Sequence, residues 1–511
     1  MAPAFTDRLQ AAAERLGFPL RDGEVDVMAE VARALLDDLE RIDALPDELL
    51  PAPAPGARDG GAPPRPEENP VHGWVWRCRV EGAADGPLAG WTVGLKDTIA
   101  LAGAPLLNGS TVMEGFVPTQ DATVVTRLLD AGATIVGKTA VPAFCFEGAG
   151  LIGHPHPLPV NPFDRERLPG ASSSGSAAVV AAGEVDLALG GDQGGSIRIP
   201  ASWCGCVGHK PTFGLVPYTG VFPVEVTLDH VGPMARTVAA CAQALDALAG
   251  ADGLDPRQAG VEPAAPAAAR LRDGVAGLRV GVLAEGFGCP GAEPEVERAV
   301  RDAIARLERD GARVEPVSVP AHRDGMALWN AICLQGATAM LLDGEAVGTN
   351  SRGHHWTELG DFYREARRRR AAQLPDTLKV TLLAGTLLAE RRGVHYYAKA
   401  QNLGRALRRD YDAALERCDV LVMPTTPMRA PRLPEGGSPG ELLLQTIGLE
   451  SAANVAPFDV TGHPALSVPC QREGELPCGL MVVGRHGDDA TVLRCGQAVE
   501  DGLRAVAGTT N

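Results

Sequence analysis

The sequence predicts an α/β protein in which helices cover a mixed, largely parallel central sheet, with a small helical appendage at the N-terminal end. From about residue 71 onward, short apolar runs rich in Val, Leu and Ile alternate with helical patterns. Such alternation is typical of strands joined by helices that pack on the sheet. Residues 1–70 contain helical patterns and a proline-rich stretch instead. With 511 residues, 45% of them hydrophobic, the chain is long enough to bury a large core.

Two helices are expected at the start of the chain. Apolar residues fall at helical spacing from Phe5 to Leu16. A second set follows at steps of three and four: Met28, Val31, Leu35, Leu39 and Ile42. Both helices are amphipathic and together too short to enclose a core, so their apolar faces must pack on the main body or on another subunit. Residues 51–70 have the composition of an extended linker. We therefore divide the chain into residues 1–70, an appendage with its linker, and residues 71–511, the main domain.

The main domain contains five apolar segments that are expected to be buried strands. They are WTVGLKD, ATIVGKT, VDLALGGD, LRVGVLAE and CDVLVMP, which begin at residues 91, 133, 185, 278 and 418. Helical patterns between them cover Thr123–Ala131, Ser176–Ala182, Val238–Leu248 and Pro294–Asp310. The last of these opens with proline, which suits a first helical position.

Composition limits the partners and the compartment. The net charge of -17, from 47 basic and 64 acidic residues, argues against a nucleic-acid surface. No run approaches 18 consecutive apolar residues, so no membrane span is expected, and the first residues lack the pattern of a secretory signal. Eleven dispersed cysteines without such a signal are typical of reduced thiols. We therefore expect a cytoplasmic protein that acts on a small molecule.

Residues that could take part in catalysis are most concentrated between Gly170 and Gly214. Two clusters of small residues, SSSGS at 172–176 and GGS at 194–196, lie on either side of a helix and a strand. A serine hydroxyl becomes a nucleophile when a base takes its proton, and N–H groups of a glycine-rich turn can hold the resulting oxyanion. SSSGS alone is better explained as a closely packed turn. Both clusters together, followed by IRIP and GHKPT, are far more specific.

This stretch resembles the amidase-signature family, which uses a Ser–cis-Ser–Lys triad. The family's bridging serine lies 24 residues before the nucleophile, as Ser172 precedes Ser196 here. The family's lysine lies in a Gly-x-Lys-Asp element, which residues 94–97 match. Further family motifs follow in order at 137–139, 419–427, 462–469 and 480–485, so the resemblance covers residues 72 to 511. The segment GGDQGGSIRIPA is most similar to the corresponding segment of bacterial amidases associated with nitrile degradation. These amidases also carry a helical N-terminal extension.

The resemblance implies a role for each site residue. Ser196 would be the nucleophile, Ser172 the bridging serine and Lys96 the proton acceptor, which must be neutral and therefore needs a pKa lowered by burial. The remaining implied roles are an oxyanion hole of Gln193, Gly194, Gly195 and Ser196, loop bracing by Ser173, Asp192 and Arg198, and a place in the acyl pocket for Cys145. The alternative for Cys145 is a thiol of the core. Ala171, Ser174 and Gly191 depart from the family motif, but none of these changes removes a group that transfers a proton.

The implied reaction is hydrolysis of a carboxamide to the acid and ammonia or an amine, through an acyl-enzyme and without a cofactor. Hydrazides, anilides and carbamates suit the same triad. The alternative is that the chain is one component of an amidotransferase complex that works on charged tRNA. The negative net charge and the helical N-terminal appendage argue against this alternative. A silent binding protein on the same fold is a third reading, against which the complete triad speaks.

Two patterns that could indicate a metal site or another nucleophile are not interpreted as sites, and the chain is expected to form a homodimer. His154 and His156 are followed by prolines and lack carboxylate partners, which favours a surface loop over a metal site. Residues 436–440 fit G-x-S-x-G but lie in a proline-rich stretch, and we expect neither the strand before nor the helix after that a nucleophile elbow requires. By resemblance to dimeric nitrile-pathway amidases, we expect a homodimer with residues 5–45 in the interface.

Overall fold

The computed structural model describes residues 4–21, 23–48, 50, 53, 58–153, 156–261 and 266–508. It divides the chain into two units, Met1–Pro51 and Ala52–Asn511. The first unit contains helices α1 (Phe5–Arg15) and α2 (Glu24–Asp43), which contact each other and match the two helices expected from periodicity. The Arg33 guanidinium of α2 lies 4.9 Å from the ring centroid of Phe5. Most of the apolar residues of these helices remain exposed.

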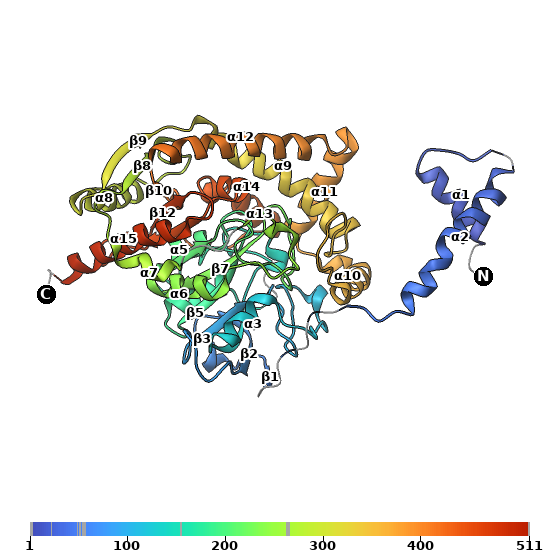
Figure 1. Ribbon diagram of the computed structural model, residues 1–511, viewed down its shortest axis with the longest axis horizontal. Helices are drawn as coiled ribbons and strands as arrows, with labels where there is room; N and C mark the ends of the chain where they lie inside the picture. The colour runs from blue at the N-terminus through green and yellow to red at the C-terminus, as the bar shows by residue number, and fades with distance from the viewer. Residues whose placement is uncertain are drawn as a thin grey trace. The chain divides into compact units, whose positions relative to one another are not determined.

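The second unit is built on one sheet, whose strands lie in the order β1-β2-β4-β3-β5-β7-β6-β11-β12-β10-β8-β9 (Figure 1). The strands are β1 (Arg58–Ala62), β2 (Trp74–Val80), β3 (Thr92–Lys96), β4 (Thr134–Thr139), β5 (Leu187–Asp192), β6 (Val207–Lys210), β7 (His230–Ala235), β8 (Arg279–Leu283), β9 (Arg313–Val317), β10 (Val420–Pro424), β11 (Ala465–Pro469) and β12 (Gly479–Gly484).

The prediction of a mixed sheet with covering helices is confirmed, but the sheet is less parallel than expected. Among the described strands, four neighbouring pairs are parallel and seven are antiparallel. The five strands expected from apolar runs are β3, β4, β5, β8 and β10, and they form three of the four parallel pairs. The strands without such a signal include β6, β7, β11 and β12. Connections without a crossover helix, such as the one from β11 to β12, favour antiparallel pairing.

Both faces of the sheet are covered. Along β5, Leu187 and Leu189 belong to the largest apolar cluster, together with residues of the helix after β7, whereas Ala188 between them belongs to a separate cluster. Along β11, Leu466 and Ala465 divide in the same way between two clusters. Because successive side chains of a strand point to opposite faces, these clusters lie on opposite sides of the sheet.

The helices of the second unit are α3 (Thr123–Asp130), α4 (Ser174–Ala181), α5 (Arg198–Cys204), α6 (Val238–Leu248), α7 (Ala267–Arg270), α8 (Pro294–Arg309), α9 (Gly325–Thr338), α10 (Thr357–Arg369), α11 (Asp376–Arg392), α12 (His395–Arg417), α13 (Pro439–Gly448), α14 (Pro457–Thr461) and α15 (Asp489–Gly508). The four helices expected between the strands are α3, α4, α6 and α8, and α8 begins at its proline. The expectation that no helix follows residues 436–440 was wrong, because Ser438 caps α13, which begins at Pro439. Helices α9, α11 and α12 contact one another and lie together in Figure 1.

Part of the stretch with linker composition forms the edge of the sheet. Strand β1 pairs antiparallel with β2, and the Arg58 guanidinium forms an ion pair with Asp121 at 2.5 Å. Its sequence, RDGGA, has no apolar pattern, because an edge strand can be held by backbone hydrogen bonds alone. Residues 51, 52 and 54–57 lie outside the described part of the chain. The division into residues 1–70 and 71–511 stays a prediction.

Candidate active site

The sheet brings the two serine clusters and the expected base to one edge. Strands β3 and β5 are parallel neighbours, with Leu95 opposite Leu189. Their carboxyl ends therefore point to the same edge, where side chains of an α/β sheet often form a site. Lys96 ends β3, and the turn that contains Ser196 follows β5. The Ser173 backbone N–H, just before α4, donates to the Ser196 carbonyl at 3.2 Å and joins the two clusters.

Lys96 and Ser172 form a buried hydrogen-bonded pair. The Lys96 side chain is 1% exposed, and its Nζ lies 2.7 Å from Ser172 Oγ and 3.0 Å from the carbonyl oxygen of Gly191. Ser172 is fully buried and follows a cis peptide bond. Burial lowers the pKa of Lys96 from its ordinary value, because the ammonium form loses its hydration. A neutral amine at this position can accept a proton from the serine hydroxyl.

A second buried lysine near the site is in a different environment. Lys138 Nζ forms an ion pair with Asp97 at 3.0 Å, and both side chains are fully buried. Within the described residues, Lys96 forms no ion pair with a carboxylate. A lysine without a carboxylate partner is easier to keep neutral. This difference favours Lys96 over Lys138 as a proton acceptor.

The turn before Ser196 needs both of its glycines. A Cβ atom on Gly195, which has a φ of +113°, would lie 2.2 Å from Val455 Cγ2. A Cβ atom on Gly194 would lie 2.8 Å from the indole ring of Trp329. Both distances are too short for real atoms, so close packing and backbone angle together require glycine here. Ser196 itself is 9% exposed, the most accessible of the three expected triad residues.

A network of buried charged side chains holds the turn before Ser196 in place. The two carboxylate oxygens of Asp192 accept hydrogen bonds from the Gly195 N–H at 2.5 Å and the Ile197 N–H at 3.0 Å. The Arg198 guanidinium binds both oxygens of Asp192, at 2.9 and 3.0 Å, and donates to Asp459 Oδ2 at 2.7 Å. Ser173 contributes a separate contact, because its Oγ donates to the Gly191 carbonyl at 3.2 Å. The residues on each side of Ser196 are thus fixed by fully buried charges.

The environment of this network shifts the pKa values of Asp192 and Asp459 in opposite directions. Burial alone would raise the pKa of Asp192, but the positive charges of Arg198 and Lys210 outweigh it and hold the pKa well below its usual value. Burial and the negative charge of Asp192 raise the pKa of Asp459. Arg198 therefore pairs mainly with an ionised Asp192. A buried pair of this kind is strongly destabilising when one partner is removed.

Two residues that support the turn, Asp459 and Trp329, were not predicted from the sequence. Asp459 is the one charged side chain in the apolar stretch 451–462, and a lone buried acid needs a partner, so a signal was present. Trp329 lies on α9, and its Nε1 donates to the Gln193 carbonyl at 2.5 Å. No sequence pattern marks it, because α9 is apolar over most of its length.

Cys145 lies beside the expected base, in an unusual backbone conformation. Phe144 and Cys145 have φ angles of +56° and +63°, which non-glycine residues rarely adopt. The half-buried Cys145 thiol lies 3.8 Å from Asn108 Oδ1 and close to the Lys96 amine. Nearby, Gln193 Nε2 donates to the Tyr218 hydroxyl at 3.2 Å. Cys145 thus lies near Lys96, and Gln193 and Tyr218 contact each other at the turn before Ser196.

Two further features concern metal ions and membranes. Within the described ranges, no group of three or more His, Cys, Asp and Glu residues is placed to hold a metal ion, and His154 falls outside those ranges.

One helical stretch, Pro320–Asp343, is long and apolar enough to cross a membrane by length and composition alone. It includes α9, which packs against α11, α12 and α14 as core helices of globular proteins do.

Comparison with known proteins agrees with this geometry. The model of the Amidase family matches residues 76–493. An enantioselective amidase from Rhodococcus rhodochrous is 44% identical over 97% of this chain and 95% of its own length. One of the subunits of the glutamyl-tRNA(Gln) amidotransferase from Methanosarcina mazei is 39% identical over 81% of this chain and 85% of its own.

A solved structure extends the agreement to the fold. The peptide amidase of Stenotrophomonas maltophilia superposes with a TM-score of 0.66, is 31% identical, and the match covers 82% of this chain and 84% of that one. The family match spans well over half of the chain and includes both serine clusters and Lys96. The chain therefore belongs to the amidase family, the amidase-signature enzymes, and is an amidase.

Proposed function

We propose that this amidase hydrolyses a small-molecule carboxamide with Ser196 as nucleophile, Ser172 as bridging serine and Lys96 as base. The observation that carries the proposal is the 2.7 Å hydrogen bond between Lys96 Nζ and Ser172 Oγ in a fully buried setting. A neutral lysine can accept a proton from Ser172 only if burial has lowered its pKa, which is the direction found.

The proposed reaction has two acyl-transfer steps. Ser196 Oγ attacks the amide carbon, its proton passes to Ser172 Oγ, and the Ser172 proton passes to Lys96 Nζ. The C–N bond then breaks while the same relay returns a proton to the leaving nitrogen. Water attacks the acyl-enzyme, with its proton taken up by the relay, and the carboxylic acid leaves. No cofactor is needed for any of these transfers.

The oxyanion of each tetrahedral intermediate would be held by backbone N–H groups of the turn. We assign this role to Gln193, Gly194 and Ser196. The Gly195 N–H was expected to be a further donor, but it already donates to Asp192 at 2.5 Å, so we assign it mainly to holding the turn. Donors fixed before the reaction need no reorganisation, which is the main source of their effect. Trp329, bonded to the Gln193 carbonyl, supports the same turn.

Covalent trapping tests the assignment of the nucleophile. The full-length chain is treated with an aryl fluorophosphonate, which forms a stable adduct with activated serines, and peptides are examined by mass spectrometry. We expect one adduct, on the peptide that contains Ser196, and none in Ser196→Ala. Lys96→Met should slow labelling while leaving the fold intact. An adduct on Ser172 or Ser438, or equal labelling of Ser196→Ala, would overturn the proposal.

The second candidate is a component of a tRNA-dependent amidotransferase, which the Methanosarcina mazei relative favours. The net charge of -17 disfavours direct contact with tRNA. Purified alone and given a panel of aryl and aliphatic amides, a free-standing amidase turns over at least one of them. A chain that hydrolyses no amide until the other components are added would support the second candidate. Hydrazide, anilide and carbamate analogues in the same panel identify the leaving group.

We further propose that the enzyme is a cytoplasmic homodimer that uses α1 and α2. All eleven cysteines are free, as expected for a reducing compartment. Apolar side chains of α2 are half or more exposed, and a helix face of this kind is stable only when it is covered: Val27, Val31, Leu35, Leu39 and Ile42.

A further inference from the structure

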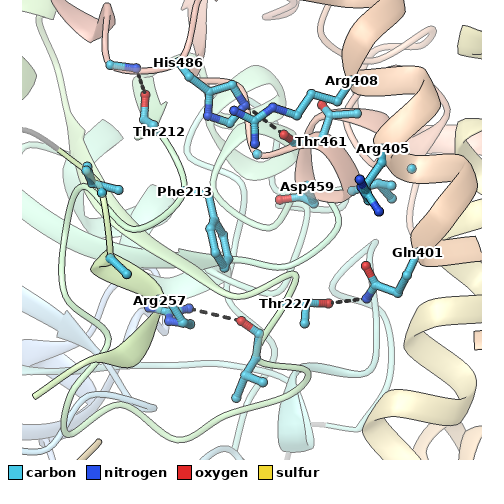
Figure 2. A pocket seen from close by; sticks show the side chains of 18 residues that line it. Thr212, Phe213, Thr227, Arg257, Gln401, Arg405, Arg408, Asp459, Thr461 and His486 are labelled. Carbon is cyan, nitrogen blue, oxygen red and sulfur yellow. Dashed lines mark hydrogen bonds between the residues drawn. The ribbon is translucent and has the colours of Figure 1, made fainter. Parts of the chain in front are cut away.

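A large cavity lies in the second unit, away from the proposed triad. Its volume is about 810 Å³, within the range of small-molecule sites. Residues of α12 form one wall, and the loops around Phe213 and Arg257 face them (Figure 2). Lys96, Ser172 and Ser196 are not among the residues that line it. Asp459 also lines the cavity, and its Oδ2 accepts the hydrogen bond from Arg198 described above.

The α12 wall carries positive charge without full compensation. Arg405 and Arg408 extend from α12 toward the cavity (Figure 2). Among the described residues, Arg405 forms no hydrogen bond or ion pair, and the nearest carboxylate to Arg408 is Asp412, at 3.8 Å on an exposed face. Arginine side chains in this state have most of their donors free, and guanidinium groups bind carboxylates and phosphates well.

The other charges of the cavity are paired. Asp459 adds little negative charge to the cavity, because burial and the negative charge of Asp192 raise its pKa, and its Oδ2 accepts a hydrogen bond from Arg198 at 2.7 Å. Arg257 is held by Asp255 at 2.6 Å and by backbone carbonyls of Val226 and Asp229. The free charge of the cavity therefore comes from Arg405 and Arg408.

His486 is consistent with a positive potential at this wall. Its Nε2 lies 2.9 Å from the Thr461 carbonyl, so the ring donates there as a neutral imidazole. Burial, then the positive charges of His463 and Arg408, lower the pKa of His486 to about 3. Burial alone would disfavour a charge of either sign, so only the contribution of Arg408 to this pKa shift indicates a positive potential at this wall.

The cavity also has apolar lining residues. Phe213, Val226, Val261 and Val460 line the cavity together with the arginines. Apolar walls with a few convergent polar groups are typical of sites that bury the body of a ligand and fix its polar end. We propose that this cavity binds a small organic anion, a carboxylate or a phosphate ester with an apolar body, whose charged group binds Arg405 and Arg408.

Binding to the full-length Ser196→Ala protein tests this site without turnover. Benzoate, phenyl phosphate and inorganic phosphate are titrated by calorimetry at constant ionic strength, with benzyl alcohol as the uncharged comparison. We expect saturable binding of benzoate or phenyl phosphate, weaker binding of inorganic phosphate, and none of benzyl alcohol. Preference for phenyl phosphate over benzoate identifies the phosphate class, and the reverse identifies the carboxylate class.

Four variants decide where the anion binds. Arg405→Ala/Arg408→Ala should weaken binding at least tenfold, and Arg405→Ala alone should weaken it by a smaller factor. Arg409→Ala removes one positive charge from α12, as Arg405→Ala does, but at a residue that does not line the cavity, and should change Kd less than twofold. Circular dichroism shows that each variant is folded. Arg405→Glu, a milder change to packing, should weaken binding in the same way. No saturable binding, or binding that Arg405→Ala/Arg408→Ala leaves unchanged, would overturn the proposal, the latter because the anion then binds elsewhere.

Discussion

Gly195→Ala separates the cost of an unusual backbone angle from the cost of moving the nucleophile. Gly195 has a φ of +113° and would place a Cβ atom 2.2 Å from Val455 Cγ2. Gly250 offers a matched control, because it has a φ of +108° and no atom within 4 Å of an added Cβ. The two alanine variants therefore share the backbone strain, and only one of them has the clash.

The structure gives an expected size for each effect. Alanine at either position in a left-handed conformation costs about 1–2 kcal/mol of the free energy of unfolding. At residue 195 the displacement of packed neighbours adds about 1–3 kcal/mol. Because Ser196 follows directly, relief of the clash moves its Oγ, and a shift of order 1 Å reduces the rate about 10²-fold. Gly250→Ala should keep wild-type activity.

Urea unfolding and kcat/KM on one amide measure both effects. Gly195→Ala should be less stable than Gly250→Ala and about 10²-fold less active. Adding Val455→Ala removes the nearest clashing atom and should restore part of the activity, although Ile199 Cδ1 remains at 2.9 Å. Equal kcat/KM for Gly195→Ala and Gly250→Ala would refute the idea that close packing positions the nucleophile.

Four further predictions concern the triad and the N-terminal helices. Ser196→Ala and Ser172→Ala should each lower kcat by ~10³ or more with unchanged unfolding, and residual activity above about a hundredth of wild type excludes that assignment. Activity should fall as pH drops through the lowered pKa of Lys96, and a flat profile from about pH 5 to 9 would contradict a lysine base. Since native Lys96 holds its proton less tightly than the unfolded chain does, stability should also rise with pH between the lowered pKa and 10.5, a slope that Lys96→Met removes. Light scattering should give a dimer for the full chain and a monomer for a chain that starts near Arg58 and so keeps strand β1, and two monomers would disprove the dimer.

Local patterns predicted the helices and the parallel part of the sheet well. Helix α6 spans the predicted residues, and β3, β5 and β10 lie in the predicted apolar runs. Strands such as β7, with the sequence HVGPMA, gave no signal because their positions depend on backbone pairing with neighbours distant in sequence. The edge strand β1 was hidden in a stretch of linker composition for the same reason.

The candidate site divides in a similar way. Lys96, both serine clusters and Asp192 could be identified from motifs whose spacing is preserved along the chain. Asp459 and Trp329 could not be placed, because each meets the nucleophile turn only through the tertiary fold, 261 residues from Arg198 and 136 residues from Gln193. Side chains that support a turn from distant segments leave a weaker pattern than those within it.

The order of these residues along the chain matters during synthesis. Lys96 and both serine clusters are complete by residue 196, but Asp459 and Val455, which hold Arg198 and Gly195, are translated much later. Strand β11, which pairs with β6 and completes the middle of the sheet, is also made late. A nascent chain that ends before residue 455 does not yet contain Asp459. The side of the Arg198 guanidinium that binds Asp459 then has no carboxylate partner. We expect such chains to hold every group of the proposed chemistry and yet to hydrolyse nothing, so that amide hydrolysis begins only when the ribosome has nearly finished.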